Sequence, residues 1–382
     1  MLKDVLAAMF GLGAAAIAQN TLLVDPSNPA AYATLTSAVA AAQDGDIIRI
    51  AASAVLIDAP PLIDKALRII GQGSALRGAM QVSIPAGKEF TLQGCSLGLP
   101  AFHAFPTIAT FADCAGRVTL IDCAPPGWGY GFGTLRIRDC AQVLLSGCGM
   151  LGDEAPGLEV LRSTVSLERC TLLGQDGDYE QSYAAREGLL LSSAQVQCVD
   201  CAIHGGNQGV RLGGVVPGTL AVACSLSSLT IAGPATSIAS GTGYAGVPIA
   251  LNASTMTLAP EVIAAWTGGT VTVQAVPTIL PTNMVLGQTG TLQLRSPSGT
   301  FGAILVGQPG DRATLPGVGD FWLDPHATCT AVLGIQGTAN NLTWTIAIPN
   351  AAAFAASQFR WQGVTFDGVT LRASPPGATM LR

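Results

Sequence analysis

The chain has 382 residues, among them 46 glycines and 23 prolines, and only 11% of its residues are charged. This composition is too apolar and too weakly charged for a disordered protein, and it suits a turn-rich all-β protein with room for two domains. A net charge of −6 with only three lysines (Lys3, Lys65 and Lys88) argues against a nucleic-acid-binding surface, so we expect no nucleic-acid partner.

The first 18 residues have the pattern of a secretory signal peptide. Lys3 gives a short positive start, residues 5–18 are apolar, and Ala16-Ile17-Ala18 is an A-x-A cleavage site. The apolar stretch is too short to span a bilayer, and no later apolar run reaches about 18 residues despite a mean hydropathy of +0.46. We therefore expect a secreted or cell-surface protein with no membrane span in the mature chain. An uncleaved membrane or lipid anchor is the alternative.

A helix and then a strand are predicted near the start of the mature chain. Residues 32–42 are alanine-rich with apolar positions at helical spacing, and Gly45 supplies the glycine that is typical after a helix. Residues 46–50 then have the pattern of a first strand. A helix at this place would cover an open sheet edge, which otherwise invites aggregation.

A cysteine recurs after a short apolar run six times between residues 91 and 224. The steps between these cysteines are 28, 25, 22, 31 and 23 residues. A period in the twenties is typical of stacked coils with three short strands each, which bury their apolar side chains only against neighbouring coils. We expect the six cysteines to form one inward-facing column: Cys95, Cys123, Cys148, Cys170, Cys201 and Cys224.

A second slot for small residues precedes several of these cysteines. It holds Cys114, Cys140, Ser163 and Ala194. Small side chains in both slots indicate core packing. Disulfides between adjacent coils, such as Cys114 with Cys140, are an alternative, because stacked strands lie about 4.8 Å apart. Metal binding is a further alternative, although Cys198-x-x-Cys201 lacks a second pair with zinc-site spacing.

The opening of the mature chain resembles a known family. The residues that carry the resemblance are Asp25-Pro26, Tyr32-Ala33-Thr34-Leu35, Ala38, Asp44-Gly45-Asp46-Ile47-Ile48 and Ala66-Leu67-Arg68-Ile69-Ile70-Gly71-Gln72-Gly73. They are similar to the first coils of secreted right-handed parallel β-helix proteins of the pectin-lyase-like superfamily, over roughly residues 20–250. The resemblance implies a fold more than an activity, because this superfamily contains lyases, hydrolases, epimerases, adhesins and phage tailspikes.

Past Cys224 the pattern changes. From about residue 266, short alternating strands follow without the twenty-residue period, which is typical of a small antiparallel sandwich. The predicted fold is therefore all-β: a right-handed parallel β-helix with an N-terminal capping helix, followed by a small antiparallel β-sandwich. The predicted segments are 1–18 (signal peptide), 19–250 (β-helix), 251–265 (connection) and 266–382 (accessory sandwich). The accessory domain would bind a glycan or anchor the protein, or else act only as a spacer.

Segments of variable length follow the stacked cysteines, leave the same corner, and should lie side by side. Long loops on a rigid scaffold are where binding usually occurs. The candidate substrate-binding residues there are Trp128, Tyr130, Tyr179 and Asn207. The candidate catalytic residues are Asp176, Asp178, Glu180, Arg186, His204 and Arg211. The three acids Asp176, Asp178 and Glu180 are also the candidates for a calcium site, because calcium prefers oxygen ligands.

Three chemistries compete for these loops. Glycoside hydrolysis needs two carboxylates around the scissile bond, but the Asn-Thr-Asp, Asp-Asp and Arg-Ile-Lys motifs of polygalacturonase-like members are absent and only His204-Gly205 echoes their His-Gly. Lyase chemistry needs a base and calcium-bound carboxylates, for which Arg186 or Arg211 would serve beside a thin acid cluster. A loop turn held by side-chain-to-backbone hydrogen bonds explains Asp176-Gly177-Asp178 without any ligand.

These observations predict a carbohydrate-directed β-helix protein that binds polysaccharide or a cell-surface glycan rather than cleaving it. No cofactor is expected, with calcium as the one exception considered. The first alternative is a non-enzymatic structural or adhesive rod. The second is a polysaccharide lyase or glycoside hydrolase with a diverged site.

Overall fold

The computed structural model describes residues 20–52, 54–56, 62–77, 79–98, 107–124, 134–152, 155–176, 184–211, 214–282, 284–337, 341–350 and 358–381. The chain divides into two compact units, Gln19–Val273 and a second unit containing Gln274–Arg382. The described secondary structure is nearly all β, with α2 (Leu35–Ala41) as the one helix in those ranges. No helix among the described residues is long and apolar enough to cross a membrane.

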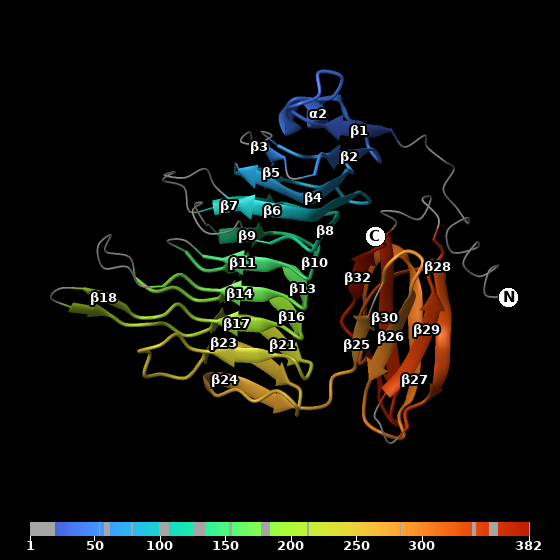
Figure 1. Ribbon diagram of the computed structural model, residues 1–382. Coiled ribbons are helices and arrows are strands. Elements are labelled where there is room, and N and C mark those ends of the chain that lie inside the picture. The colour runs from blue at the N-terminus through green and yellow to red at the C-terminus, as the bar shows by residue number, and fades with distance from the viewer. Residues whose placement is uncertain are drawn as a thin grey trace. The chain divides into compact units, whose positions relative to one another are not determined.

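The first unit is a right-handed parallel β-helix whose strands form three columns (Figure 1). Column A contains β1 (Thr21–Val24), β2 (Ile47–Ile50), β4 (Arg68–Arg77), β6 (Glu89–Gly98), β8 (Arg117–Ile121), β10 (Gln142–Ser146), β13 (Thr164–Glu168), β16 (Gln195–Val199), β21 (Ser228–Ala232), β23 (Ile249–Leu258) and β24 (Trp266–Val273). Column B contains β3 (Val55–Leu56), the second halves of β4 and β6, β11 (Gly149–Leu151), β14 (Thr171–Leu173), β17 (Ala202–His204) and β22 (Ser237–Ala239). Column C contains β5 (Met80–Val82), β7 (Thr107–Ala112), β9 (Thr134–Arg138), β12 (Leu158–Leu161), β15 (Leu189–Ser192), β20 (Val222–Ser225) and the first halves of β23 and β24.

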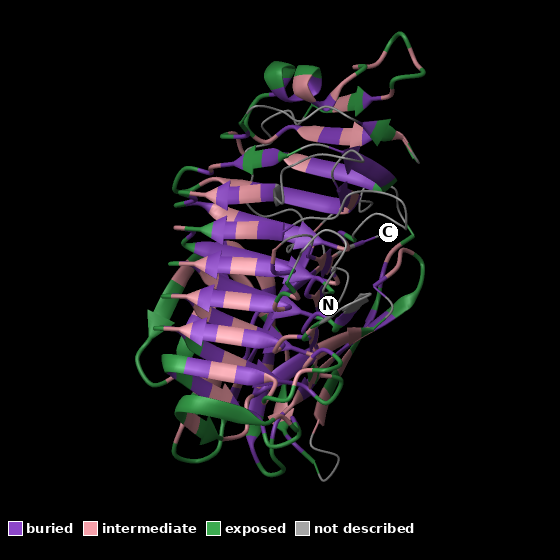
Figure 2. Cartoon of the chain, turned by 90° about the vertical axis from the view of Figure 1, so that its left-hand side faces the viewer, coloured by how far each residue is buried: buried purple, intermediate pink, exposed green. Residues whose placement is uncertain are grey.

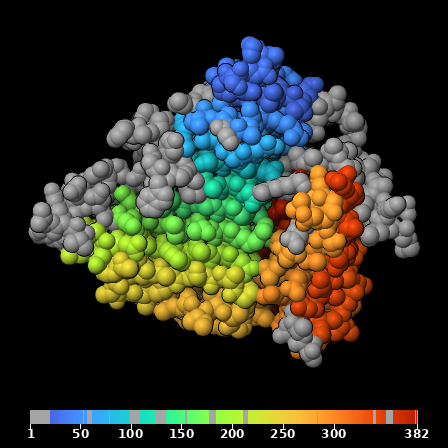
Figure 3. Space-filling model, in the orientation of Figure 1, coloured from blue at the N-terminus to red at the C-terminus, as the bar shows by residue number. Residues whose placement is uncertain are grey.

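Each coil runs from column A to column B, through a loop to column C, and back to column A. Successive coils pair in parallel, so equivalent residues form rows along the helix axis. The short helix α2 lies at the N-terminal end of the stack, as predicted, and Thr34 caps it by accepting the Ser37 N–H at 3.1 Å (Figure 1). Buried and half-buried positions alternate along the stacked strands (Figure 2), and the coils follow one another in chain order (Figure 3). The predicted all-β parallel β-helix is confirmed.

The corner from column C to column A repeats one backbone device. Six corner residues in the described ranges have left-handed φ values between 45° and 55°: Asp113, Asp139, Arg162, Ser193, Leu226 and Ala253. The residue after each of them points inward and is buried, which explains the predicted slot for small residues. The Cys140 thiol there donates to the carbonyl two residues back at 3.3 Å, and the Ser163 and Ser227 hydroxyls do the same at 2.8 and 2.7 Å. Cysteine and serine therefore fill the same role at this corner.

The corner from column A to column B carries the main cysteine column. Five consecutive coils place a buried cysteine just after the corner: Cys95, Cys123, Cys148, Cys170 and Cys201. Each thiol donates to the carbonyl two residues back at 3.4–3.6 Å. The Cys148 thiol also lies within hydrogen-bonding reach of the thiols above and below it. All ten cysteines of the chain fall in the described ranges and all are free thiols.

One predicted member of this column is wrong. Cys224 lies on β20 in column C, where it faces Leu191 and Leu251 in neighbouring coils. The coil after Cys201 has Gly233 at the equivalent corner. Sequence spacing misled the prediction because the long connection before β20 changes the length of that coil, so a step of 23 residues reaches a different column.

The boundary between the two units also differs from the prediction. Parallel pairing continues through β23 and β24, which end at Val273. The expected connection at 251–265 therefore contains most of β23, and the start of the expected sandwich belongs to the β-helix. The amino-acid composition changes after residue 225 because serine and threonine occupy the outward positions. Met256 and Leu258 nevertheless remain buried in the core of the coil.

The second unit consists of two antiparallel sheets around one core. One sheet contains β25 (Thr278–Thr282), β26 (Thr289–Arg295) and β29 (Asn341–Ala347). The other contains β28 (Gly319–Ile335), β27 (Phe301–Leu315), β30 (Gln358–Phe366), β31 (Leu371–Ala373) and β32 (Gly377–Met380). Leu292 and Leu294 of the first sheet pack against Ile304, Val306 and Trp361 of the second. This is the predicted antiparallel sandwich, and Trp361 is core rather than surface.

Candidate functional site

The structure describes the side chains of four sequence-predicted site residues: Asp176, Arg186, His204 and Asn207. Arg211 is the last residue of β18 (Gly209–Arg211), which pairs with β19 (Gly214–Val216). The remaining candidates lie outside the described residues: Trp128, Tyr130, Asp178, Tyr179 and Glu180. The predicted acid cluster is therefore represented by Asp176 alone.

Asp176 and Asn207 form a hydrogen-bonded ladder at the base of the loops between columns B and C. An Asp176 carboxylate oxygen accepts the Asn207 N–H at 2.7 Å, and the Asn207 side-chain oxygen accepts the Thr242 N–H at 3.0 Å. Between them, a Cβ on Gly206 would come within 1.6 Å of the Gln175 carbonyl oxygen, so only glycine fits there. These side-chain-to-backbone bonds link successive coils. The predicted loop turn Asp176-Gly177-Asp178 continues outside the described residues and stays a prediction.

His204 and Arg186 lie next to this ladder, but among the described residues no hydrogen bond joins their side chains to Asp176 or Asn207. His204 is half-buried on β17, with Nε2 at 3.2 Å from the Ser237 hydroxyl. Arg186 is exposed; its N–H donates to the Gln175 carbonyl of its own connection, and its carbonyl accepts the Gly206 N–H of the next coil, at 2.9 Å each. Within the described ranges, no three histidine, cysteine or acidic side chains come together as a metal site.

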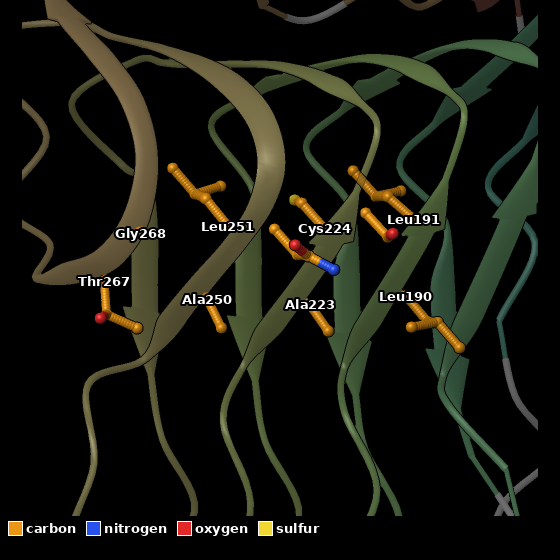
Figure 4. Close-up of a pocket in the computed structure, with 10 residues that line it drawn as sticks. Leu190, Leu191, Ala223, Cys224, Ala250, Leu251, Thr267 and Gly268 are labelled. Atoms are coloured by element: carbon orange, nitrogen blue, oxygen red, sulfur yellow. The ribbon is translucent and has the colours of Figure 1, made fainter.

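A shallow depression lies on the outer face of column C (Figure 4). Its floor is one row across four coils: Leu190, Ala223, Ala250 and Thr267. The two alanines hollow the surface between larger side chains, and Ser225 and Asn252 edge the depression, whose volume is about 410 Å³. The same row continues toward the N-terminus with Glu159 and Arg136, which form an ion pair at 2.6 Å.

A second depression, the corner groove, follows the corner between columns C and A and has a volume of about 520 Å³. One side of the corner groove is a row of hydroxyl and amide side chains in register on successive coils: Thr164, Gln195, Ser228 and Thr255. The corner residues Ser193, Leu226 and Ala253 line it as well, and Leu226 is 65% exposed. The groove thus offers repeated polar groups beside an apolar surface.

The floor of the corner groove is held rigidly by hydroxyl groups. The Ser227 hydroxyl accepts the Ala194 N–H at 3.1 Å and donates to the Ser225 carbonyl at 2.7 Å. One coil further, the Ser254 hydroxyl accepts the Ser227 N–H at 3.0 Å and donates to the Asn252 carbonyl at 2.9 Å. Each hydroxyl ties two coils together, so the outward row keeps its spacing.

The charges at the N-terminal end of the corner groove are neutralised. Arg162 donates to both oxygens of Asp139, at 2.6 and 2.7 Å. This bidentate pair lowers the pKa of the Asp139 carboxyl below its usual range. Among the described residues that line the two depressions, Arg162 is the one charged side chain. Both surfaces therefore suit an uncharged ligand.

Neither depression was predicted, because aromatic side chains are absent from both described linings and Arg162 is the one charged residue there. A usable signal was nevertheless present. The small residues Ser163 and Ala194 mark the inner slot of the corner, and the next residue in each coil points outward into the groove. Following that position along the chain gives the row of threonine, glutamine and serine.

No family model matches the chain, and no curated protein matches it. Among solved structures, it is similar to the enzymatically active domain of bacteriophage CBA120 tailspike protein 2, with 10% identity and a TM-score of 0.37 over 95% of this chain and 76% of that one. It is also similar to tailspike protein gp49 of the Acinetobacter baumannii bacteriophage Fri1, a capsular polysaccharide depolymerase, with 8% identity and a TM-score of 0.19 over 88% and 73%. Geobacillus virus E2 ORF18 gives 9% identity and a TM-score of 0.20 over 88% and 68%. At these identities and TM-scores, the similarities say nothing about the function of this chain.

Proposed function

We propose that this protein binds an extended, uncharged polysaccharide along the corner groove and the outer face of column C, without cleaving it. The observation that carries the proposal is the row of Thr164, Gln195, Ser228 and Thr255 beside the exposed Leu226. The predicted signal peptide is consistent with action outside the cell or at its surface.

The chemistry of the corner groove matches that of a neutral sugar chain. Hydroxyl and amide side chains both donate and accept hydrogen bonds, as sugar hydroxyls do. The row repeats at the strand spacing of about 4.8 Å, so a polymer of similar repeat can meet the same group in each coil. Leu226 and the alanines of the column C face offer apolar contact for the C–H faces of the rings. Both volumes fall within the range of roughly 300–1,000 Å³ that is usual for ligand sites.

Binding is favoured over glycoside hydrolysis by the position of the acids. Hydrolysis uses two carboxyl groups on either side of the scissile bond. The described lining of the two depressions contains no carboxylate. The nearest acids in these rows, Asp139 and Glu159, are held in ion pairs with Arg162 and Arg136 at 2.6 Å.

Affinity electrophoresis of the mature protein in gels containing neutral or anionic polysaccharides tests this function. We expect retardation by at least one neutral polysaccharide and none by the anionic ones. An assay for new reducing ends and for unsaturated products should stay at background. If no polysaccharide retards the protein, the proposal is contradicted, and the non-enzymatic structural or adhesive rod remains as the alternative. Product formation would instead indicate a hydrolase or a lyase.

Leu226→Asp locates the site. Aspartate is tolerated at this left-handed corner position, since Asp113 and Asp139 occupy the equivalent positions in other coils. The new charge should weaken neutral glycan binding by at least about 10-fold, or roughly 1.4 kcal/mol. The matched control is Leu62→Asp, which adds the same charge at a leucine that is 47% exposed elsewhere in the β-helix. Equal affinities for the two variants would remove the corner groove from the proposal while leaving glycan binding intact.

A further inference from the structure

The outer face of the larger sheet in the second unit carries a row of exposed apolar side chains. Register places Ile335 of β28 beside Phe301 of β27, Phe301 beside Phe366 of β30, and Phe366 beside Leu371 of β31. Their exposed fractions are 69%, 42%, 40% and 42% in that order. Four neighbouring strands thus present one continuous apolar row to solvent.

A second apolar row runs parallel to the first, two residues along each strand. It contains Leu333, Ala303, Val364 and Ala373, of which Leu333 is 59% exposed. We call these two rows the apolar sheet face. The alternate residues, such as Ile304 and Val306, point to the other side and form the core of the sandwich. A sheet that is apolar on both faces is typical of one that is covered on both faces.

We propose that a second copy of this chain docks on the apolar sheet face, giving a twofold-symmetric dimer. The inference is independent of glycan binding by the β-helix. It concerns a different unit of the chain and a different kind of partner.

The pattern of the first row favours a second copy as the occupant. The order across the sheet is aliphatic, aromatic, aromatic, aliphatic, with Phe301 and Phe366 in the middle. In a twofold interface the same patch meets itself. An axis midway between the two phenylalanines would lay aromatic against aromatic and aliphatic against aliphatic. The face carries no charged side chain, so the two copies would meet without electrostatic repulsion.

The area of the apolar sheet face also fits a dimer. Since a full aromatic side chain presents roughly 150–250 Å², the five large side chains together expose on the order of 500 Å² at the fractions given above. A standard interface buries about 800 Å² on each partner, and somewhat more than half of that is apolar. The exposed apolar area therefore matches the apolar share of a standard interface.

A sugar ligand fits the apolar sheet face poorly. None of its eight side chains donates or accepts a hydrogen bond. Hydroxyl groups placed against it would lose water without gaining a partner, which is costly. The chemistry of this face therefore differs from that of the corner groove, where polar groups repeat.

Sedimentation equilibrium of the mature chain over a range of concentrations tests the dimer. We expect the wild type to reach twice the monomer mass. Phe301→Lys should raise the dimer dissociation constant by at least about 30-fold, as expected for the loss of a central interface residue. Thr345→Lys adds the same charge at an exposed position of β29, on the other sheet, and should leave the dimer unchanged.

Three outcomes would overturn the inference. The first is a wild type that stays monomeric at every concentration, which would show that no second copy docks on the apolar sheet face. The second is a Phe301→Lys variant that dimerises as the wild type does, and the third is dissociation by Thr345→Lys. If Phe301→Lys does not fold, as judged by circular dichroism, Leu333→Lys at the more exposed end of the face decides the question.

Discussion

The two short corners of the β-helix use the same backbone device but differ in their chemistry. Both place a left-handed residue at the bend and a small inward residue after it, whose side chain donates to the carbonyl two residues back. The corner between columns A and B fills the inner slot with thiols in five consecutive coils. The other corner has cysteine in its first coils (Cys114 and Cys140) and serine or alanine in the later ones, where it is flanked by the corner groove. The corner between columns A and B thus contributes a core of buried thiols. The corner between columns C and A combines hydrogen bonds between coils with the proposed binding surface.

The largest expected effect is a loss of unfolding free energy at alkaline pH, caused by the thiols at the corner between columns A and B. Burial raises the pKa of the Cys95, Cys148 and Cys201 thiols at the corner between columns A and B. A thiol whose folded pKa is raised stabilises the protein fully below its unfolded pKa, near 9, and loses this contribution as pH rises through the folded pKa. Above pH 9 each such thiol should reduce the unfolding free energy by about 1.4 kcal/mol per pH unit.

Denaturant unfolding at pH 8, 9 and 10 measures this loss. Cys95→Ala, at the corner between columns A and B, should reduce the slope between pH 9 and 10, whereas Ser227→Ala at the other corner should leave the slope unchanged. A wild-type stability that is flat from pH 8 to 10 would show that these thiols are not protected by burial.

A β-branched residue at the bend is expected to have the next largest effect. Asp200 and Leu226 share a φ of 51°, a region that valine adopts only with strain. Asp200 also accepts the Ala235 N–H at 2.9 Å. Asp200→Val should therefore lower the unfolding free energy by about 2–3 kcal/mol, and Leu226→Val by about 1 kcal/mol. Equal losses in chemical denaturation would mean that backbone strain alone governs these bends.

Alanine in the inner slot should have the smallest effect, and it distinguishes the two corners. Ser227→Ala removes the acceptor of the Ala194 N–H and should cost about 1–3 kcal/mol. Cys148→Ala removes a packed thiol that makes only weak bonds, and should cost about 1 kcal/mol. Cys148→Ser should cost no more, because a hydroxyl in this slot can donate to the Ser146 carbonyl, as Ser163 does to its own carbonyl two residues back. A larger loss for Cys148→Ser than for Ser227→Ala, measured by chemical denaturation, would contradict the equivalence of the two slots.

Much of the fold could be predicted from the sequence because each coil repeats a local pattern. Apolar residues alternate within single strands, and a small residue follows each bend, so the coil, its corners and five members of the cysteine column are visible in stretches of about 25 residues. The capping helix was predictable for the same reason. The candidate site was predicted less well, because Asp176 and Asn207 bond to backbone groups of the next coil, and spacing along one strand cannot show such contacts.

The sequence by itself determined that this chain stacks into a parallel β-helix, because the inward pattern of each repeat is local. Tertiary structure alone decided which residues of different coils share a row. Cys224 left its predicted column, and Thr164, Gln195, Ser228 and Thr255 came together although unequal lengths of chain separate them. The physical reason is that register is set by hydrogen bonds between coils, while the connections from column B to column C vary in length. Distance along the sequence therefore does not measure position along the helix axis.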